Sequence, residues 1–328
     1  MKAIHFNGAG GAEVIALVEV PIPTPQHDEL LIKVHTAGIN GPDVMQRKGL
    51  YAPPKGVTEI PGLEVSGTVV QSDSAGTFAV GQEVCALIQG GGYAEYAVAK
   101  AENTVPIPTG ISLTEAGGFL ETFMTVWAHL FQFAGFTEGK SILIHGGASG
   151  IGTTATMLAK AFGASQIFTT VSNKENQIRS VELGADIAIN YREEDFVQVV
   201  KQHTEGRGVD YVLDLIVGTY VQRNYDVAAM YGTIVQIGVM QGKAPEVDLF
   251  PMLAKRLTHL GATLRSQSPQ QKAQVLQALQ EKVYPLILQG SIKPVIHKAF
   301  PLSKAKDAHK ELDKGGHFGK FVLNISEP

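Results

Sequence analysis

Residues 141–164 read SILIHGGASGIGTTATMLAKAFGA and join three local patterns. The apolar run at 141–144 is typical of a buried parallel strand, and apolar residues recur at helical spacing over 151–162. Only residues without a Cβ let main-chain N–H groups approach a pyrophosphate at the positive end of a helix, and the loop between the two patterns supplies Gly146, Gly147, Gly150 and Gly152. The stretch therefore predicts a strand, a phosphate-binding loop and a helix that together bind a dinucleotide.

The spacing of these glycines fits two dehydrogenase fingerprints. One is Gly147-x-Ser149-x-x-Gly152, with a serine where the common fingerprint has its second glycine, and a serine hydroxyl can itself hydrogen-bond a phosphate. The other, Gly146-x-x-x-Gly150-x-Gly152, resembles the short-chain dehydrogenase loop. A short-chain enzyme would begin with this loop and carry Tyr-x-x-x-Lys downstream. Here about 140 residues precede the loop and no later tyrosine has lysine four residues on. A glycine-rich turn that binds nothing is the remaining alternative.

Composition describes an ordinary globular chain large enough for about two domains. It has 328 residues, 44% hydrophobic and 18% charged, with a net charge of −4. Nucleic acid is an improbable partner because there is no general basic field. The N-terminus MKAIHF shows no signal peptide and glycines and acids break the apolar stretch 111–136, so we expect a cytoplasmic protein without a membrane span. The only cysteine, Cys85, excludes an intrachain disulfide and is expected to be buried.

The pattern of predicted secondary structure changes near Thr122. Short alternating strands are predicted before it at 30–34, 65–70, 84–88 and 93–98, as in a β barrel or sandwich. After it, strands near 142, 167, 187, 211 and 234 alternate with helices, which implies a parallel sheet covered on both faces. One long helical stretch at 270–288, another at 303–314 and a strand at 320–325 follow. We therefore expect one domain from 1–122 plus 264–328 and a nucleotide-binding domain from 123–263 inserted in it.

Over its whole length the chain resembles the medium-chain dehydrogenase/reductase superfamily. Three strings, AGINGPDVMQRKGLY at 37–51, PGLEVSG at 61–67 and GGGYAEY at 90–96, are similar to the quinone oxidoreductase (zeta-crystallin-like) branch, and most to its p53-inducible type. The resemblance implies an α/β fold in which a Rossmann doubly wound parallel sheet is inserted in a GroES-like β-rich catalytic domain. Related proteins are homodimers or tetramers joined through the last strand of the nucleotide sheet, here 258–264 (THLGATL), so a homodimer is expected.

The resemblance also places the zinc ligands of alcohol dehydrogenases, a cysteine and a histidine, at Asn40 and Leu63. Leucine has no lone pair, and an amide is a poor zinc ligand beside thiolate and imidazole. No two of the ten histidines stand three or four residues apart. We therefore expect no metal site. Without zinc to polarise it, the acceptor should already be electrophilic, which favours quinones and conjugated carbonyls over simple ketones.

Residues after the second strand of the nucleotide domain bear on the choice of cofactor. An NAD site would place an acid there for the ribose hydroxyls, but the chain has Ser172, Asn173 and Lys174. A hydroxyl and an ammonium suit a 2′-phosphate, so NADPH is favoured over NADH, although Glu175 argues mildly against it. Lys174 as a solvated lysine at a helix start is the alternative. Members of the branch also set a tyrosine against the 2′-phosphate, and Tyr191 occupies the matching place, unless it only packs.

Further cofactor contacts rest mostly on the resemblance. Thr125 is expected to hold the nicotinamide or its ribose, unless its hydroxyl only bonds its own helix. Segments 238–240 and 263–265 are expected beside the ring and its carboxamide. The family's Asp-x-x-Gly-Gly appears as DLIVG at 214–218, so Val217 departs from the pattern and puts the shape of the pocket in doubt. The complete set of expected cofactor contacts is Asn40, Thr125, Gly147, Ser149, Gly150, Ile151, Gly152, Ser172, Lys174, Tyr191, Gly238, Val239, Met240 and Leu264.

Asn40 and Tyr51 are the expected catalytic residues. An amide and a phenol can both donate a hydrogen bond to a quinone oxygen, which stabilises negative charge as hydride or electrons arrive. The alternative for Tyr51 is packing on Pro53 and Pro54. His145 is interpreted as a hydrogen-bonded structural histidine rather than an acid or base. Three functions stay open: NADPH-dependent quinone reduction, NADPH-dependent reduction of alkenal or enone double bonds with Tyr51 as proton donor, and NADPH binding with little turnover.

Overall fold

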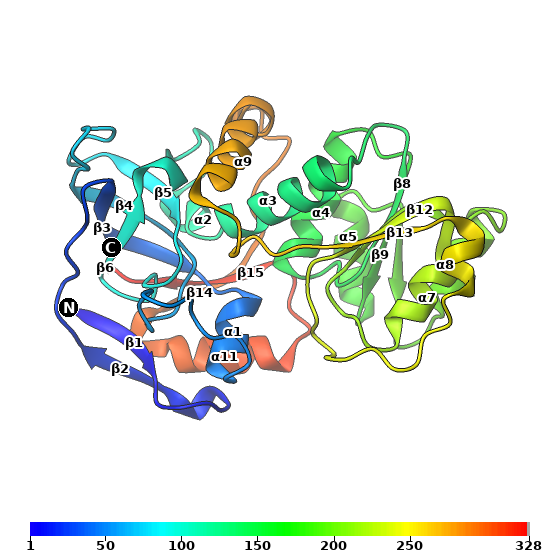
Figure 1. The fold of residues 1–328 in the computed structure, drawn as a ribbon, viewed down its shortest axis with the longest axis horizontal. Helices are drawn as coiled ribbons and strands as arrows, with labels where there is room; N and C mark the ends of the chain where they lie inside the picture. The colour runs from blue at the N-terminus through cyan, green and yellow to red at the C-terminus, as the bar shows by residue number, and fades with distance from the viewer. Residues whose placement is uncertain (327–328) are drawn as a thin grey trace. The chain divides into compact units, whose positions relative to one another are not determined.

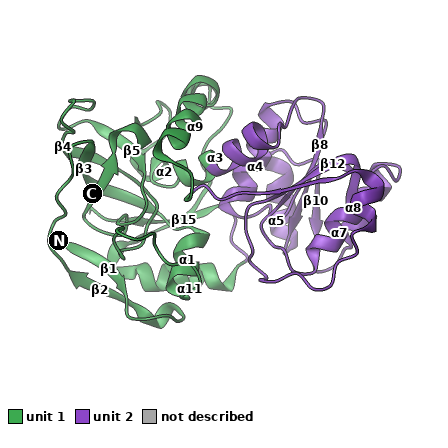
Figure 2. Ribbon diagram, in the orientation of Figure 1, with its two compact units in different colours: residues 1–124, 265–315, 319–328 green, residues 125–264, 316–318 purple. Residues whose placement is uncertain are grey.

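The computed structural model describes residues 1–326, which form two compact units (Figure 2). Unit 1 contains residues 1–124, 265–315 and 319 onward. Unit 2 contains residues 125–264 and 316–318. The two terminal parts of the chain thus share one unit, and the glycine-rich loop at 146–150 belongs to the other.

Unit 1 is built on a seven-stranded sheet and a small two-stranded one (Figure 1). Its central strand is β3 (Glu29–Gly38), in which seven of ten residues are buried. Apolar residues through this stretch explain why it forms a strand in the core. The path of the larger sheet is β14 (Ile296–Pro301), β15 (Lys320–Asn324), β3, β4 (Glu64–Gln71), β5 (Glu83–Leu87) and β7 (Thr104–Pro106), and β6 (Tyr96–Lys100) also pairs with β3. The smaller sheet pairs β1 (Lys2–Phe6) with β2 (Ile15–Glu19). All strand pairings in these two sheets are antiparallel except the one between β14 and β15.

Short helices connect these strands, and most of them begin at a recognisable cap. The α-helices are α1 (Gly41–Arg47), α2 (Leu113–Ala116), α9 (Pro269–Lys282), α10 (Tyr284–Leu288) and α11 (Ala305–Lys314), with 3-10 turns η1 (Ala12–Val14), η2 (Ala101–Asn103) and η4 (Leu302–Lys304). The single long helix expected over 270–288 was wrong. The chain breaks at Val283, between α9 and α10, because Pro285 has no N–H to continue the ladder.

Unit 2 is a doubly wound parallel sheet with helices on both faces (Figure 1). Its strand order is β10 (Ile187–Asn190), β9 (Gln166–Val171), β8 (Ser141–Ile144), β11 (Val209–Asp214), β12 (Ala228–Gln236) and β13 (Thr258–Gly261). The connections are α4 (Gly150–Ala161), α5 (Lys174–Leu183), α6 (Phe196–His203), α7 (Tyr220–Val227) and α8 (Phe250–Lys255). The order reverses at β8, so the loop after β8 lies where ligands bind in this class of sheet.

The chain passes from unit 1 into unit 2 within a helical segment. It consists of α3 (Leu120–Val126), followed by a π-helical run, η3 (Trp127–Phe133). Its residues 122–130 are all buried. Within residues 1–326, no helix has the length and apolar character needed to cross a bilayer.

Each unit has its own apolar core. In unit 1 the core joins both sheets to α11 through side chains that include Ile32, Val65, Val84, Phe300 and Phe321. In unit 2 it joins strands of the parallel sheet to α6 and α7 through side chains that include Leu143, Phe168, Phe196, Tyr220 and Ile234. These rigid cores hold the strand ends and loops that carry the candidate sites.

Candidate active site

The loop between β8 and α4 is packed against its own backbone and the next strand. The N–H of Gly147 donates to the carbonyl oxygen of Thr170 at 2.8 Å. A Cβ on Gly147 would come within 2.6 Å of the Cβ of Thr169, and a Cβ on Gly152 would overlap the carbonyl oxygen of Gly146. Side chains are thus excluded from the loop. The N–H groups of Gly146, Gly147, Ser149 and Gly152 are used in hydrogen bonds within the unit, which fixes the path of the backbone. The loop therefore fits a pyrophosphate.

The start of α4 adds hydrogen-bond donors to this loop. The hydroxyl oxygen of Ser149 accepts the N–H of Gly152 at 3.0 Å, so Ser149 caps the helix and its hydroxyl hydrogen is left to donate to a phosphate. The N–H groups of Gly150 and Ile151 lie in the first turn, where no helical carbonyl reaches them. The helix dipole favours an anion at the same end.

The ends of β9 and β10 bring together the residues expected at the 2′-phosphate. Ser172 and Lys174 follow β9, and Tyr191 follows β10. The N–H of Tyr191 donates to the carbonyl oxygen of Val171 at 3.1 Å, which ties the two strand ends together. Lys174 is exposed and forms no ion pair with any residue in 1–326. By contrast, the side chain of Asn173 is engaged, because it caps α5.

The ends of β11 and β12 are joined through Asp214. Its carboxylate accepts the N–H groups of Ile216 at 2.6 Å and Val217 at 3.2 Å. The Gln236 amide donates to the carbonyl oxygens of Asp214 at 3.1 Å and Gly238 at 2.6 Å. The backbone of the segment that starts at Gly238 is therefore fixed, and the side chains that follow it, those of Val239 and Met240, are exposed.

Val217 has a strained backbone. Its φ is +64°, in the left-handed region, where a β-branched residue is an outlier. Its side chain is nevertheless buried in the core of unit 2. The glycine that the family pattern has here would adopt this φ without cost. The departure at Val217 thus places strain in the loop after β11.

His145 is structural, as interpreted from the sequence. Its ring is fully buried, with Nδ1 at 3.2 Å from the Thr170 hydroxyl and Nε2 at 2.8 Å from the Asn224 side-chain oxygen. Burial lowers its pKa. A neutral, doubly hydrogen-bonded ring is a poor acid or base, so the interpretation is confirmed.

Two further expected cofactor residues are mostly buried. Thr125, in α3, is 8% exposed, and its hydroxyl makes no hydrogen bond to any of the residues that the structure describes. The alternative in which this hydroxyl bonds its own helix is therefore not what the structure has. Leu264 is buried at the end of the segment that follows β13.

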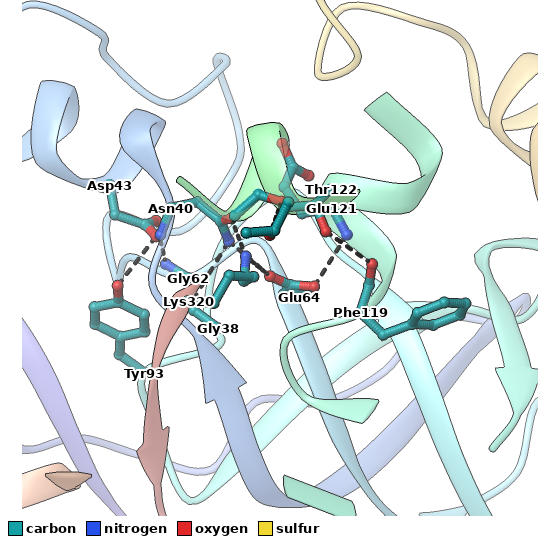
Figure 3. Close-up of polar contacts among 12 residues, drawn as sticks. Gly38, Asn40, Asp43, Gly62, Glu64, Tyr93, Phe119, Glu121, Thr122 and Lys320 are labelled. Atoms are coloured by element: carbon teal, nitrogen blue, oxygen red, sulfur yellow. Dashed lines mark hydrogen bonds and ion pairs between the residues drawn. The ribbon is translucent and has the colours of Figure 1, made fainter. Parts of the chain in front are cut away.

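In unit 1, Asn40 belongs to a buried charge cluster (Figure 3). The Lys320 ammonium donates to Asn40 Oδ1 at 2.5 Å and to Glu64 Oε1 at 2.6 Å. Asn40 Nδ2 donates to the same Glu64 oxygen at 2.9 Å, and it lies at the limiting distance of 3.5 Å from the carbonyl oxygen of Gly38. The carboxamide is therefore oriented by an ion pair, and its second Nδ2 hydrogen is the one least committed within the cluster.

Asp43 holds the backbone around Asn40. It accepts the N–H of Asn40 at 2.8 Å, the N–H of Gly62 at 3.0 Å and the hydroxyl of Tyr93 at 3.0 Å. Burial raises its pKa to about 6 despite these three donors. Asp43 is therefore a structural anchor. Its hydrogen bonds to the main-chain N–H groups fix the loop before α1 and the turn at Gly62.

Glu121 lies at the edge of the same cluster. Its N–H donates to Glu64 Oε2 at 3.0 Å (Figure 3). Burial, and then the neighbouring Glu64 carboxylate, raise the pKa of the Glu121 carboxyl to about 8. In the sequence this glutamate stands out only as one of the acids that interrupt the apolar stretch 111–136.

Tyr51 is paired with an arginine. The Arg265 guanidinium carbon lies 5.2 Å from the centre of the Tyr51 ring, and Arg265 Nη2 donates to the carbonyl oxygen of Gln89 at 2.7 Å. Two other guanidinium nitrogens, Nε and Nη1, are shielded from solvent without a hydrogen-bond partner. The Tyr51 hydroxyl is likewise unpaired among residues 1–326. Arg265 was expected on the carboxamide side of the cofactor, and the structure puts it beside Tyr51.

Metal ligands are missing from the positions where alcohol dehydrogenases carry zinc. The Asn40 side chain is hydrogen-bonded to Lys320 and Glu64, and Leu63 is buried and apolar. In the described part of the chain, no three His, Cys, Asp or Glu side chains come together as a metal site would require. Cys85 is buried, and burial raises the pKa of its thiol beyond the physiological range.

Comparisons with known proteins agree with this architecture. Residues 26–109 match the alcohol dehydrogenase GroES-like domain, and residues 150–281 match the zinc-binding dehydrogenase domain. The quinone oxidoreductase of Rattus norvegicus is 29% identical, over 98% of this chain and 97% of the rat protein. The structure of Escherichia coli quinone oxidoreductase complexed with NADPH has a TM-score of 0.89 and 27% identity, over 99% of this chain and 100% of the other. A structure of an NAD-dependent alcohol dehydrogenase has a TM-score of 0.88 and 28% identity, again over 99% and 100%.

A GroES-like β unit, a doubly wound parallel unit and a glycine loop at its switch point define a nicotinamide-dependent oxidoreductase. The chain belongs to the medium-chain dehydrogenase/reductase superfamily, and its relatives include quinone oxidoreductases.

The charge cluster is the part of the site that sequence reasoning missed. Glu64 and Asp43 were quoted only within family strings, and Lys320 only as the first residue of a strand. A lysine that begins an apolar strand is typical of a solvated boundary, so the sequence carries little sign that Lys320 is buried. An acid directly before the strand predicted at 65–70, Glu64, was the one available signal.

Proposed function

We propose that this protein reduces quinones with NADPH. The observation that carries the cofactor choice is the exposed Lys174, which forms no ion pair within residues 1–326. It follows a strand end that has Ser172 and Asn173 where an NAD site has an acid, and that strand end is tied to the one before Tyr191. A cation and a hydroxyl favour a 2′-phosphate, which an acid there would repel. The NADPH in the related E. coli structure supports the same choice. The choice of a quinone as acceptor is supported by the similarity to quinone oxidoreductases and by Asn40 and Leu63 at the positions of the zinc ligands of alcohol dehydrogenases.

When bound, the reduced nicotinamide supplies a hydride. The residues of the chain bind the cofactor and orient the acceptor. The loop between β8 and α4 holds the pyrophosphate, and Lys174 holds the 2′-phosphate. The Lys320–Glu64 pair fixes the Asn40 carboxamide, whose second Nδ2 hydrogen can donate to an acceptor oxygen. The Tyr51 hydroxyl donates to the acceptor from the Arg265 side. Both are uncharged donors that stabilise the negative charge developing on oxygen.

A second candidate is the reduction of an alkenal or enone double bond. It would use the same cofactor site and needs a proton donor at the α-carbon. The unpaired Tyr51 hydroxyl is the observation that keeps this reaction open.

The test is oxidation of NADPH and NADH by EDTA-treated protein with an ortho-quinone, a para-quinone and a 2-alkenal in parallel. We expect fast oxidation of NADPH with a quinone and little with NADH. Turnover of the alkenal alone would move the protein to the double-bond reductases. Tight NADPH binding without turnover of any acceptor would overturn both reactions and leave a binding protein.

The Tyr51 assignment has its own test. Tyr51→Phe removes only the phenol hydroxyl and keeps the ring under Arg265. We expect a lower kcat with unchanged NADPH affinity. Undiminished quinone turnover by this variant would show that Tyr51 only packs.

A further inference from the structure

Three acidic residues belong to the charge cluster of unit 1, and Glu121 differs from the other two because only its main-chain N–H bonds within the cluster (Figure 3). Glu64 accepts hydrogen bonds from Lys320 and Asn40 on one oxygen and from the Glu121 N–H on the other. Asp43 accepts three hydrogen bonds. The Glu121 carboxyl makes no hydrogen bond or ion pair with any residue in the described range 1–326. It is therefore the one acid in the cluster that is left available to a ligand.

Charged groups from four different elements surround the Glu121 carboxyl. Two are acids that disfavour its ionised form, Glu64 on β4 and Asp43 on α1, and two are cations that favour it, Lys320 on β15 and Lys272 on α9. Lys320 is already committed to Glu64 and Asn40, and Lys272 donates to the carbonyl oxygen of Arg265. Burial outweighs both cations, and the pKa stands at about 8. At neutral pH the group is a carboxylic acid with a proton to give.

The place of Glu121 in its helix matches the place of the chemistry. Glu121 and Thr125 are four residues apart in α3 and therefore lie on one face of it. Thr125 is the residue expected to hold the nicotinamide or its ribose, and its hydroxyl is unpaired. The start of the same helix is tied to Asn40, the residue expected at the acceptor oxygen, because Glu64 accepts both the main-chain N–H of Glu121 and the Asn40 amide.

We propose that Glu121 is the general acid that protonates the reduced acceptor. This inference rests on the proposed function. The quinone takes a hydride from the nicotinamide and becomes a hydroquinone monoanion. The O–H bond of Glu121 then breaks, its proton forms a new O–H bond on the acceptor oxygen, and the Glu121 carboxylate is left. Water returns a proton to the carboxylate before the next turnover. Direct proton delivery by solvent would need no such acid, and the tests below distinguish the two.

The first test compares Glu121→Gln with Glu121→Asp and with Glu102→Gln, which alters an exposed glutamate on η2. The wild-type kcat for a quinone should fall as pH rises above about 8, because Glu121 then loses its proton. Glu121→Gln should lower kcat at pH 7 by roughly 10²-fold and abolish this fall, since general acids contribute about 10²–10⁴-fold. Glu121→Asp should retain part of the rate with a pH-dependent profile, and Glu102→Gln should match wild type.

A second measurement is independent of turnover. In protein with ¹³C-labelled glutamate and no cofactor, one carboxyl carbon should titrate near pH 8, and this signal should be missing from Glu121→Gln. An ionised Glu121 at pH 7 would overturn the proposal. So would a Glu121→Gln variant that turns over quinones at the wild-type rate with the wild-type pH profile. If the wild-type protein itself reduces neither quinone nor alkenal, the proposed function fails first, and the titration reports on the acid alone.

Discussion

The glycine-rich loop of unit 2 and the charge cluster of unit 1 reach their geometry by different routes. The loop is one continuous stretch, in which glycines allow tight backbone packing and the N–H groups of Gly150 and Ile151 at the start of α4 have no helical acceptor. The cluster is assembled from side chains as far as 280 positions apart, Asn40 and Lys320. A backbone site is therefore sensitive to an added Cβ, and a side-chain site is sensitive to a lost charge. The following predictions test that difference, beginning with the largest expected effect.

Lys320→Met should damage the cluster most. It leaves the Glu64 carboxylate buried without its cation, and breaking a buried ion pair on one side costs about 3–5 kcal/mol. We expect this loss in the free energy of unfolding measured with urea. The double variant Lys320→Met with Glu64→Gln removes both charges and should recover most of it. A loss below about 1 kcal/mol for the single variant would mean that the pair does not organise the cluster.

Gly152→Ala should damage the loop through backbone overlap rather than charge. Its Cβ would collide with the carbonyl oxygen of Gly146, so the loop has to move. We expect NADPH to bind roughly 30-fold more weakly, equivalent to about 2 kcal/mol of strain. The matched control is Gly41→Ala, because a Cβ at Gly41 has no atom within 4 Å. Equal NADPH affinities for the two variants would refute the tight packing of the loop.

Lys174→Ala should change the choice of cofactor and leave the fold intact. Removing an exposed cation from the 2′-phosphate should weaken NADPH binding about tenfold and leave NADH binding unchanged. The difference should shrink as salt is added, because the interaction is screened. Fluorescence titrations with both cofactors measure it. An equal loss of affinity for NADPH and NADH would show that Lys174 does not recognise the 2′-phosphate.

A substitution at Val217 should have a small effect on stability, but the sign of this effect is well defined. Alanine is usually about 0.5–1 kcal/mol more stable than glycine within an element. At Val217 the order should reverse, because φ is +64° and only glycine adopts it without strain. Thermal unfolding of Val217→Gly and Val217→Ala should therefore favour the glycine variant. A more stable alanine variant would show that this loop carries no strain.

The pH dependence of stability should also single out Glu121. Its folded-state pKa of about 8 lies above the ordinary value of 4.5, so the folded protein binds this proton more tightly than the unfolded chain. The contribution to stability is complete below pH 4.5 and is lost as pH rises to about 8. Glu121→Gln cannot titrate, so its melting temperature relative to wild type should increase from pH 5 to pH 9. A constant difference would contradict the raised pKa.

The contrast between the two regions also explains what the sequence could predict. The loop and helix α4 follow from the local spacing within residues 141–164, and the alternation of strands and helices in unit 2 follows from the local patterns up to about residue 236. The ion pair that orients Asn40 depends on β15 pairing beside β3, a long-range contact that has no local pattern. The break between α9 and α10 could have been predicted from Pro285, but the apolar periodicity continues through it and concealed the boundary.

The contacts that depend on the cofactor and acceptor remain predictions: Thr125, Lys174, Tyr191, Val239 and Met240 for the cofactor, and Asn40 and Tyr51 for the acceptor. The same holds for a homodimer. Strand β13 does lie at the edge of its sheet, and Phe250 and Leu253 of the preceding helix are exposed. These features are compatible with pairing between two copies.

A single-turnover reaction tests the central claim most directly. The protein is saturated with NADPH, treated with EDTA, mixed without oxygen with an excess of an ortho-quinone, and the absorbance of the reduced nicotinamide is followed. The account predicts complete loss of bound NADPH in one rapid phase, with formation of one hydroquinone for each NADPH. Bound NADPH that stays reduced in the presence of the quinone would contradict it.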